Sequence, residues 1–212
     1  MAKALTASGG PVVLADMADN TGGGAAGDGT EILAELLRVG ARSCVVACLW
    51  DPAAVQECVK TGVGGRVTLD VGGKVDQRHG PPLRMTGTVR TLSDGRFVHK
   101  GPMMHGLPAR LGTTAVLDVD DVKVILISYR WQTLDPEMIR FVGLDPLAER
   151  ILVVKSTIHY RAAFEPIAKE MIEVDAPGLS SSNLSRFEFE RIRRPIFPLD
   201  PDAPYAPEVT PA

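Results

Sequence analysis

Short apolar runs rich in β-branched residues alternate with amphipathic stretches in the first third of the chain. The runs at 11–16 (PVVLAD) and 43–50 (SCVVACLW) predict buried strands. Between them, apolar side chains recur at helical spacing from about residue 29 to 39, and Asp51-Pro52 opens a second helix. Strand, helix, strand, helix is the beginning of a layered α/β structure.

The middle of the chain changes to an alternation of period two. Val67, Leu69 and Val71 alternate with polar residues, which predicts a half-buried strand. Further strand signals lie at 83–92, 96–100, 114–119 and 122–127. We expect these segments to form antiparallel hairpins, with one turn at 93–95 and another at 120–121.

Layered α/β character returns after about residue 130. The predicted elements are a helix from Asp135-Pro136 to about Val142, a buried strand at 151–155, a helix capped by Ser156 that runs through Ala168, and a strand at 171–174. Beyond Asp175 the chain has seven prolines, so little regular structure is expected there. Part of this tail is expected to dock onto the body through the apolar residues Phe187, Phe189, Ile192 and Ile196.

Together these patterns predict an α/β fold with a mixed sheet and flanking helices, a β-rich antiparallel middle section and an irregular Pro-rich C-terminal tail. We assign residues 1–10 to a disordered N-terminus, 11–200 to one domain and 201–212 to the tail. Within the domain, the α/β core spans 11–64 and 130–175, and the β-rich section spans 65–129. The β-rich section is expected to be inserted into the core or packed beside it.

Composition excludes several function classes. The net charge of −3 offers no basic surface for nucleic acid or anionic lipid. The three cysteines contain no CxxC pair, which argues against a disulfide scaffold or a thiolate zinc site and favours the cytoplasm. We expect Cys44 and Cys48 to be small core side chains. The sequence has neither a secretion signal nor a long apolar run that would span a membrane.

A Gly-rich loop follows the first predicted strand. Gly22-x-Gly24-x-x-Gly27 matches the dinucleotide-binding pattern, and Asp51 lies at roughly the spacing of a ribose-binding acid. The polar residues before Gly22 and the absence of a lysine in the loop weaken a phosphate-binding interpretation. A phosphate- or dinucleotide-binding module remains the alternative function, and a simple connecting turn is the plainest interpretation.

With its flanks, the loop segment VVLADMADNTGGGAAGDGTEIL resembles the opening of the C-terminal domain of the MlrC-type, microcystin-degrading metallopeptidase family. The resemblance continues in order through LWDPAAV, VTLDVGGK, PLRMTGTVRTLSDGRFVHKGPM and GLDPLAERILVVKSTIHYRAAFEPIA to RRPIFPLD, over about residues 11–200. Thr21 and Ala26 stand where the family commonly has proline. The resemblance implies zinc-dependent hydrolysis of small peptides, with a larger N-terminal domain that carries the metal ligands.

The histidines show no metal-binding spacing. His79, His99, His105 and His159 form no HxH, HxxH or HExxH motif, and the first three are expected on the surface. We therefore predict that the zinc implied by the resemblance has no ligands in this chain, and we assign no catalytic residue to it. The chain is then expected to need a metal-bearing N-terminal domain, or a separate chain that supplies it.

A substrate cleft is expected beyond the carboxyl ends of the strands, because ligands of α/β sheets gather there. The predicted cleft-lining residues are Asp19, Asn20, Gly22, Gly23, Gly24, Asp28, His159 and Arg161. In this hypothesis the loop amides hold polar groups of a substrate and Arg161 meets a substrate carboxylate. A third possibility is a purely structural role, in which the chain buries an apolar face against another subunit.

Overall fold

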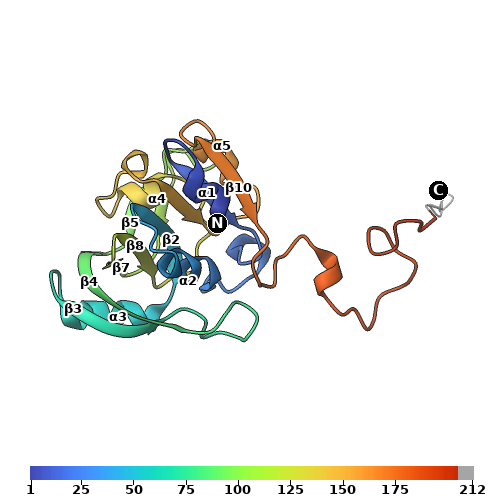
Figure 1. Cartoon of the computed structure of the whole chain (residues 1–212), viewed down its shortest axis with the longest axis horizontal. Helices are drawn as coiled ribbons and strands as arrows, with labels where there is room; N and C mark the ends of the chain where they lie inside the picture. The colour runs from blue at the N-terminus through green and yellow to red at the C-terminus, as the bar shows by residue number, and fades with distance from the viewer. Residues whose placement is uncertain (205–212) are drawn as a thin grey trace.

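Eight strands form one mixed sheet in the computed structural model, which describes residues 1–204 (Figure 1). The strands are β1 (Val12–Asp16), β2 (Cys44–Trp50), β3 (Arg66–Val71), β4 (Leu83–Ser93), β7 (Thr114–Val119), β8 (Val122–Ile127), β9 (Ile151–Val154) and β10 (Glu170–Val174). Their order is β10-β1-β9-β2-β8-β7-β4-β3. The first five are parallel to one another, and the pairs β8–β7, β7–β4 and β4–β3 are antiparallel.

Short helices cover both faces of this sheet. They are α1 (Ala2–Thr6), α2 (Glu31–Arg38), α3 (Pro52–Thr61), α4 (Glu137–Arg140) and α5 (Arg161–Phe164), with 3-10 turns at Thr21–Gly23, Pro146–Ala148 and Leu184–Arg186. The apolar residues of α2 and α3 pack on one face, and those of α4 and α5 pack on the other. Alternate residues of each buried strand point into these two cores, which gives three layers.

A β-bulge interrupts β2 near its carboxyl end. Cys48 has a positive φ of 60°, and the pairing with β8 shifts register between Val46 and Leu49. Burial raises the pKa of both Cys44 and Cys48 to about 12, so both thiols stay protonated near neutral pH. Their predicted role as core side chains is confirmed, because both are buried.

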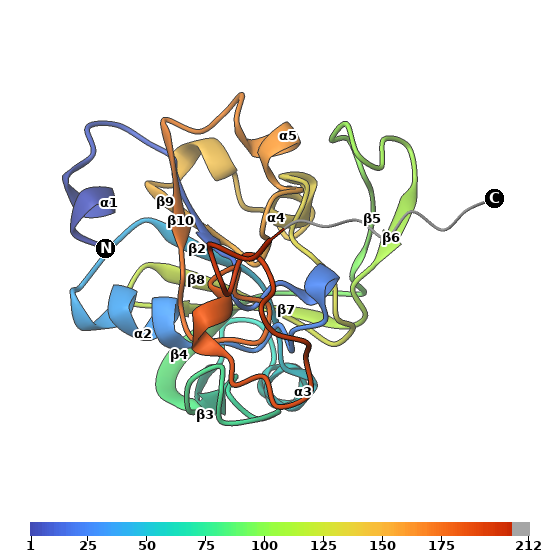
Figure 2. The ribbon, with the colours of Figure 1, turned by 90° about the vertical axis from the view of Figure 1, so that its right-hand side faces the viewer.

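The predicted fold class is confirmed, but several elements differ from the expectation. The β-rich section continues the main sheet through β8, β7, β4 and β3, beside the strands of the α/β core. The strand β5 (Arg96–Val98) pairs with β6 (Pro108–Arg110), not with β4, and Figure 2 shows this ribbon beside the body. The helix expected over 156–168 is only the single turn α5, and Ala2–Thr6 is helical where disorder was expected.

The C-terminal tail leaves the body after β10 (Figure 1). Its only helical segment in the described range is the 3-10 turn Leu184–Arg186, and it contains no strand there, as the prolines predict. Phe189, Ile192 and Ile196 are exposed, so the predicted docking of these side chains is wrong. The predicted tail at 201–212 lies partly outside the described residues. Within residues 1–204, no helix is long and apolar enough to cross a membrane.

Candidate functional site

The candidate site lies at the carboxyl ends of two neighbouring parallel strands. β1 ends at Asp16 and runs into the Gly-rich loop, while β9 is followed directly by Lys155. Because β1 and β9 pair in parallel, their carboxyl ends open on the same edge of the sheet. The topology thereby joins two segments that are far apart in the sequence.

A buried ammonium group organises this edge. Lys155 Nζ donates to Asp19 Oδ2 at 2.6 Å, to Asp16 Oδ2 at 3.1 Å and to the Gly29 carbonyl at 2.9 Å. Lys155 is 1% exposed, so this cation has exchanged its water shell for these three oxygens. It therefore ties the end of β9 to both ends of the Gly-rich loop.

The pKa directions in this group follow from burial and from the pairing. Burial by itself would lower the pKa of Lys155, but the carboxylates of Asp19 and Asp16 outweigh it and raise the pKa above its ordinary value. Burial raises the pKa of Asp16, despite the attraction of Lys155. Lys155 is therefore charged at neutral pH.

Asp19 fixes the conformation of the Gly-rich loop by accepting hydrogen bonds from two of its amides. Its Oδ1 accepts the amide of Gly27 at 2.7 Å and its Oδ2 accepts the amide of Gly29 at 2.6 Å. Gly27 has a φ of 77°, a conformation that favours glycine. Asn20 closes the other side, because its Oδ1 accepts the Gly22 amide and its Nδ2 donates to Thr157.

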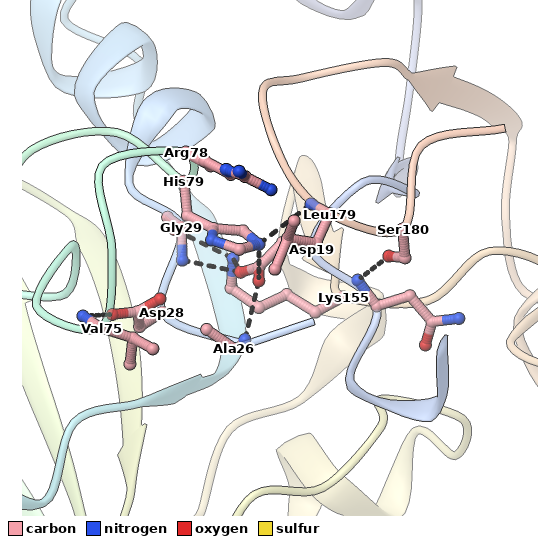
Figure 3. Close-up of polar contacts among 12 residues, drawn as sticks. Asp19, Ala26, Asp28, Gly29, Val75, Arg78, His79, Lys155, Leu179 and Ser180 are labelled. Atoms are coloured by element: carbon pink, nitrogen blue, oxygen red, sulfur yellow. Dashed lines mark hydrogen bonds and ion pairs between the residues drawn. The ribbon is translucent and has the colours of Figure 1, made fainter. Parts of the chain in front are cut away.

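A second loop covers Asp19 from outside (Figure 3). His79 Nε2 lies 3.5 Å from Asp19 Oδ1, and His79 Nδ1 lies 2.9 Å from Asp76 Oδ1. Asp28 Oδ2 accepts the amides of Lys74 at 2.8 Å and Val75 at 3.0 Å. These contacts hold the segment after β3 against the Gly-rich loop.

The surface expectation for two histidines is wrong. His79, in the segment after β3, is fully buried. His99 is 1% exposed and lies beside Asp135. The ring of His99 lies near Phe97 and Trp131. Glycines and prolines around both residues indicated loops, but the loops fold inward over the sheet. Exposure therefore depended on tertiary packing, and no local pattern reveals it.

The predicted cleft-lining residues separate into a buried and an exposed group. Asp19 and Asp28 are buried beneath the loop, so neither lines an open cleft. Gly22, Gly23 and Gly24 are exposed, but their amides donate to Asn20 Oδ1, the Asn20 carbonyl and the Thr21 carbonyl. The prediction that these amides bind substrate is therefore corrected, because their donors are already used inside the loop.

His159 does reach the exposed rim of the loop, through Gln132. His159 Nδ1 lies 3.2 Å from Gln132 Oε1, while Gln132 Nε2 donates to Ser156 Oγ at 2.9 Å. The same glutamine fills the space beside Gly22, where a Cβ would meet its side chain. Gln132 Nε2 also lies 3.2 Å from His159 Nδ1, so either tautomer of His159 can bond to Gln132 through Nδ1, and Nε2 of the exposed imidazole is the nitrogen left for a ligand.

Arg161 has a different partner from the predicted one. Its guanidinium pairs with Glu173 of β10, on the edge strand of the sheet. The side chains of both residues are partly exposed. Arg161 is therefore paired with a carboxylate of its own chain, whereas a substrate carboxylate was predicted.

Asp51 has no free oxygen for a ribose. Its Oδ1 caps α3 through the Ala54 amide at 2.9 Å, and its Oδ2 accepts the Gly72 amide at 2.8 Å and Lys74 Nζ at 2.7 Å. With the loop amides also occupied, the dinucleotide interpretation loses both of its recognition elements.

A catalytic metal site requires about three ligands and an open position for water or substrate. Within the described residues, one group of side chains has suitable ligand atoms close together, namely Asp19, Asp28 and His79. All three side chains are buried, at 0%, 1% and 0% exposure, so no open position faces solvent. This group does not fit a catalytic zinc, and we derive no hydrolytic step from it.

Four important residues escaped the sequence reasoning. Lys155, His79, Gln132 and Arg130 all contact the Gly-rich loop or its neighbours, and Arg130 stacks on Trp50 at 3.7 Å while its Nε donates to the Ala26 carbonyl. The lysine that ends the apolar run ILVVK was a usable signal, because a charge beside a buried strand needs a partner. The others carried no local signal.

Comparisons with known proteins agree with this architecture. The family model for the MlrC C-terminus matches residues 14–191. Microcystinase C from Sphingomonas sp. is 31% identical over 201 residues, which cover 95% of this chain and 38% of that protein. A crystal structure of a candidate metallopeptidase from Mesorhizobium sp. BNC1 has a TM-score of 0.84 and 32% identity, over 96% of this chain and 40% of that one. The chain therefore spans less than half the length of these relatives, and it belongs to the MlrC C-terminus family.

Proposed function

We propose that this chain is the substrate-side domain of a zinc-dependent peptidase that hydrolyses amide bonds in small peptides. The observation that carries the proposal is the family match over residues 14–191, together with relatives named as a microcystinase and a candidate metallopeptidase. Those relatives are more than twice as long as the matched region. In this proposal a metal-bearing N-terminal domain supplies the zinc and its water-activating chemistry.

The exposed rim of the Gly-rich loop is the part of this chain that would meet the substrate. His159 presents Nε2 of an exposed imidazole, which hydrogen bonds to a polar group of the substrate backbone. Gly24 has no side chain and open space where a Cβ would lie, so a peptide backbone can approach the loop closely there. Lys155 and Asp19 act from below as positioning residues, because they hold the loop in place.

The test compares the purified chain with and without a separately expressed N-terminal domain from a full-length relative. Metal content and hydrolysis of a panel of linear and cyclic peptides are measured after zinc loading. The expected result is an inert chain that supports hydrolysis only together with the N-terminal domain. Hydrolysis by the chain alone would overturn the division of roles.

His159→Ala tests the rim in the reconstituted enzyme. Loss of one substrate hydrogen bond is expected to lower kcat/KM by roughly 10-fold. His105→Ala is the matched control, because His105 is exposed and its Nδ1 contacts the Lys100 carbonyl. Equal activity of the two variants would remove His159 from the substrate site.

A further inference from the structure

Residues 194–200 of the tail form a small closed loop that lies away from the body (Figure 1). In a two-pronged ion pair, Arg194 Nε donates to Asp200 Oδ2 at 2.6 Å and Arg194 Nη2 donates to Asp200 Oδ1. Asp200 Oδ2 also accepts the Ile196 amide at 2.7 Å, and the Asp200 amide donates to the Ile196 carbonyl at 2.9 Å. Because a bidentate arginine–carboxylate pair fixes geometry, this tail loop has a defined shape through its own contacts.

The tail loop presents apolar side chains to solvent. Phe197, in the middle of the loop, is 73% exposed, and Ile196 is 37% exposed. Aromatic side chains are enriched where proteins contact each other, and a loop that is already ordered loses little freedom on binding. The tail loop therefore has the properties of an interface element.

The tail begins from a fixed point on the body. Arg186 donates to the Asp175 carbonyl at 2.9 Å and to the Ala176 carbonyl at 3.1 Å, and the Ser180 amide donates to the Ala18 carbonyl at 2.9 Å. These contacts hold residues 175–186 against the body. The arm that follows, residues 187–200, carries the tail loop outward (Figure 1).

An apolar groove lies where the tail leaves the sheet. It is a cavity of about 210 Å³ between the start of α2 and the end of the edge strand β10. Its apolar lining consists of Met1, Leu14, Ile32, Val174, Ala176 and Pro177. An apolar cavity of about 150 Å³ takes up benzene, so this groove has room for a phenyl ring.

The charges beside the groove and beside the tail loop are opposite. Glu31 and Glu35 both lie at the groove, but Glu35 pairs with Arg38. Glu31 is exposed and forms no ion pair within residues 1–204. Arg191 and Arg193, which precede the tail loop, are exposed and likewise have no ion pair in that range. An apolar groove with a free carboxylate thus complements an apolar loop that follows two free arginines.

We propose that the tail loop docks into the groove of a second copy of this chain, with Phe197 in the groove and Arg193 beside Glu31. The arm runs away from its own body, which leaves the loop available to another chain (Figure 1). Exchange of an identical element is a low-cost route to a dimer, and two-fold symmetry lets each copy give one arm and receive one. This inference does not depend on the proposed peptidase function.

The contact forms between two chains that are already folded. Its strength is therefore set by the protein concentration, as for any association. Below the dissociation constant each chain is separate, and the arm then adds nothing to the stability of the single chain.

The test measures the mass of the full chain by sedimentation equilibrium over a range of protein concentrations. We expect a reversible equilibrium between monomer and dimer. Phe197→Ala is expected to raise the dissociation constant of the dimer by at least about 30-fold, as loss of a strong interface anchor does. Val63→Ala is the matched control, because Val63 is 64% exposed and precedes β3, the opposite edge strand. It is expected to dimerise like the wild type.

A charge exchange tests the groove separately from the arm. Arg193→Glu and Glu31→Arg are each expected to weaken the dimer by about 10-fold, because each places like charges together. The chain with both changes is expected to recover most of the wild-type affinity, since the pair forms again with the signs reversed. Circular dichroism of each variant verifies that it is folded.

Four outcomes would overturn the proposal. One is a wild-type chain that stays monomeric at every concentration, and another is a dimer that Phe197→Ala leaves unchanged. A dimer that the double charge exchange fails to restore would place the arm on a different surface. Protection of the arm from trypsin only when the N-terminal domain of a relative is added would assign the arm to that domain.

Discussion

Lys155 shows how one side chain determines the local structure of the candidate site. Its ammonium donates hydrogen bonds to two carboxylates and one carbonyl that would otherwise be hydrated. All three groups belong to β1 and the loop that follows it. A buried ion pair adds little net stability compared with apolar residues, but removing one partner leaves an uncompensated charge. The ion pair therefore makes the loop geometry depend on a residue that is absent from the Gly-rich motif.

Lys155→Met tests this dependence. The variant leaves Asp16 and Asp19 buried without their cation, so the free energy of unfolding is expected to fall by about 3–5 kcal/mol. Urea denaturation measures the change. Lys60→Met is the control, because Lys60 is largely exposed and pairs with Glu57 on the same helix. A change within about 0.5 kcal/mol is expected for it. Similar losses in both variants would contradict the role of Lys155.

Asp135 provides a pH-dependent prediction. Burial acts to raise its pKa, but the amides of Glu137, Gly101 and Lys100 and the ring of His99 outweigh burial and lower the pKa below 3.8. A carboxyl group with a depressed folded-state pKa contributes stability above its unfolded-state pKa, and this contribution is lost as the pH falls through the folded-state value.

The measurement compares Asp135→Asn with the wild type by urea denaturation across acidic pH. At about pH 6 the variant is expected to be less stable by about 1–3 kcal/mol, because charge-assisted hydrogen bonds are lost. The difference is expected to shrink below about pH 4, where protonation removes the advantage of the wild type. Asp70→Asn is the control, because Asp70 is exposed on β3. A stability difference between Asp135→Asn and the wild type that stays constant with pH would refute the prediction.

Local patterns predicted strands better than helices in this chain. Runs such as 151–154 consist of apolar residues that both cores can bury, so the strand follows from composition alone. The helix expected after Ser156 is only one turn, and the residues before it make long-range contacts instead, Thr157 with Asn20 and His159 with Gln132. Pairing partners also escaped local reasoning, since β5 joins β6 through contacts that the turn at 93–95 does not determine.

Asp51 connects two elements, because its carboxylate joins the start of α3 to the segment after β3. Asp51→Ala removes the cap on Ala54 and leaves Lys74 without its carboxylate, so a loss of roughly 2 kcal/mol is expected by thermal or urea unfolding. NAD is expected to show no saturable binding to the wild type, because Asp51 is already occupied. Micromolar NAD binding that Asp51→Ala weakens would restore the dinucleotide interpretation.

At the scale of the whole molecule, this chain forms an eight-stranded sheet of its own, and its relatives are longer. Eight strands share two cores, so the described part of the chain carries its own hydrophobic interior. The start of the tail contacts this body, whereas the later residues of the tail contact it less. Ser180 and Leu179 hydrogen bond to residues of the loops, whereas the side chains of Phe189 and Phe197 are exposed.

Two truncations test this division of the tail. A chain that ends at residue 187 is expected to unfold within about 0.5 kcal/mol of the full chain, because the removed apolar side chains are exposed. A chain that ends at residue 176 loses the hydrogen bonds of Ser180 with Met17 and Asn20, so a loss of more than about 2 kcal/mol is expected. Equal stability of the two truncations, measured by urea denaturation, would contradict the assignment.

The sequence alone determined the α/β class, most of the strands and the family, because these depend on local apolar runs and on motifs read in order. Tertiary structure decided the candidate site. Lys155 meets Asp19 only because β1 and β9 are neighbours in the sheet, and His79 meets Asp19 only because the segment after β3 folds over the loop. Burial of Asp19 and Asp28 likewise follows from these long-range contacts. Spacing along a chain cannot encode them, since they depend on strand order and on how loops pack across a sheet.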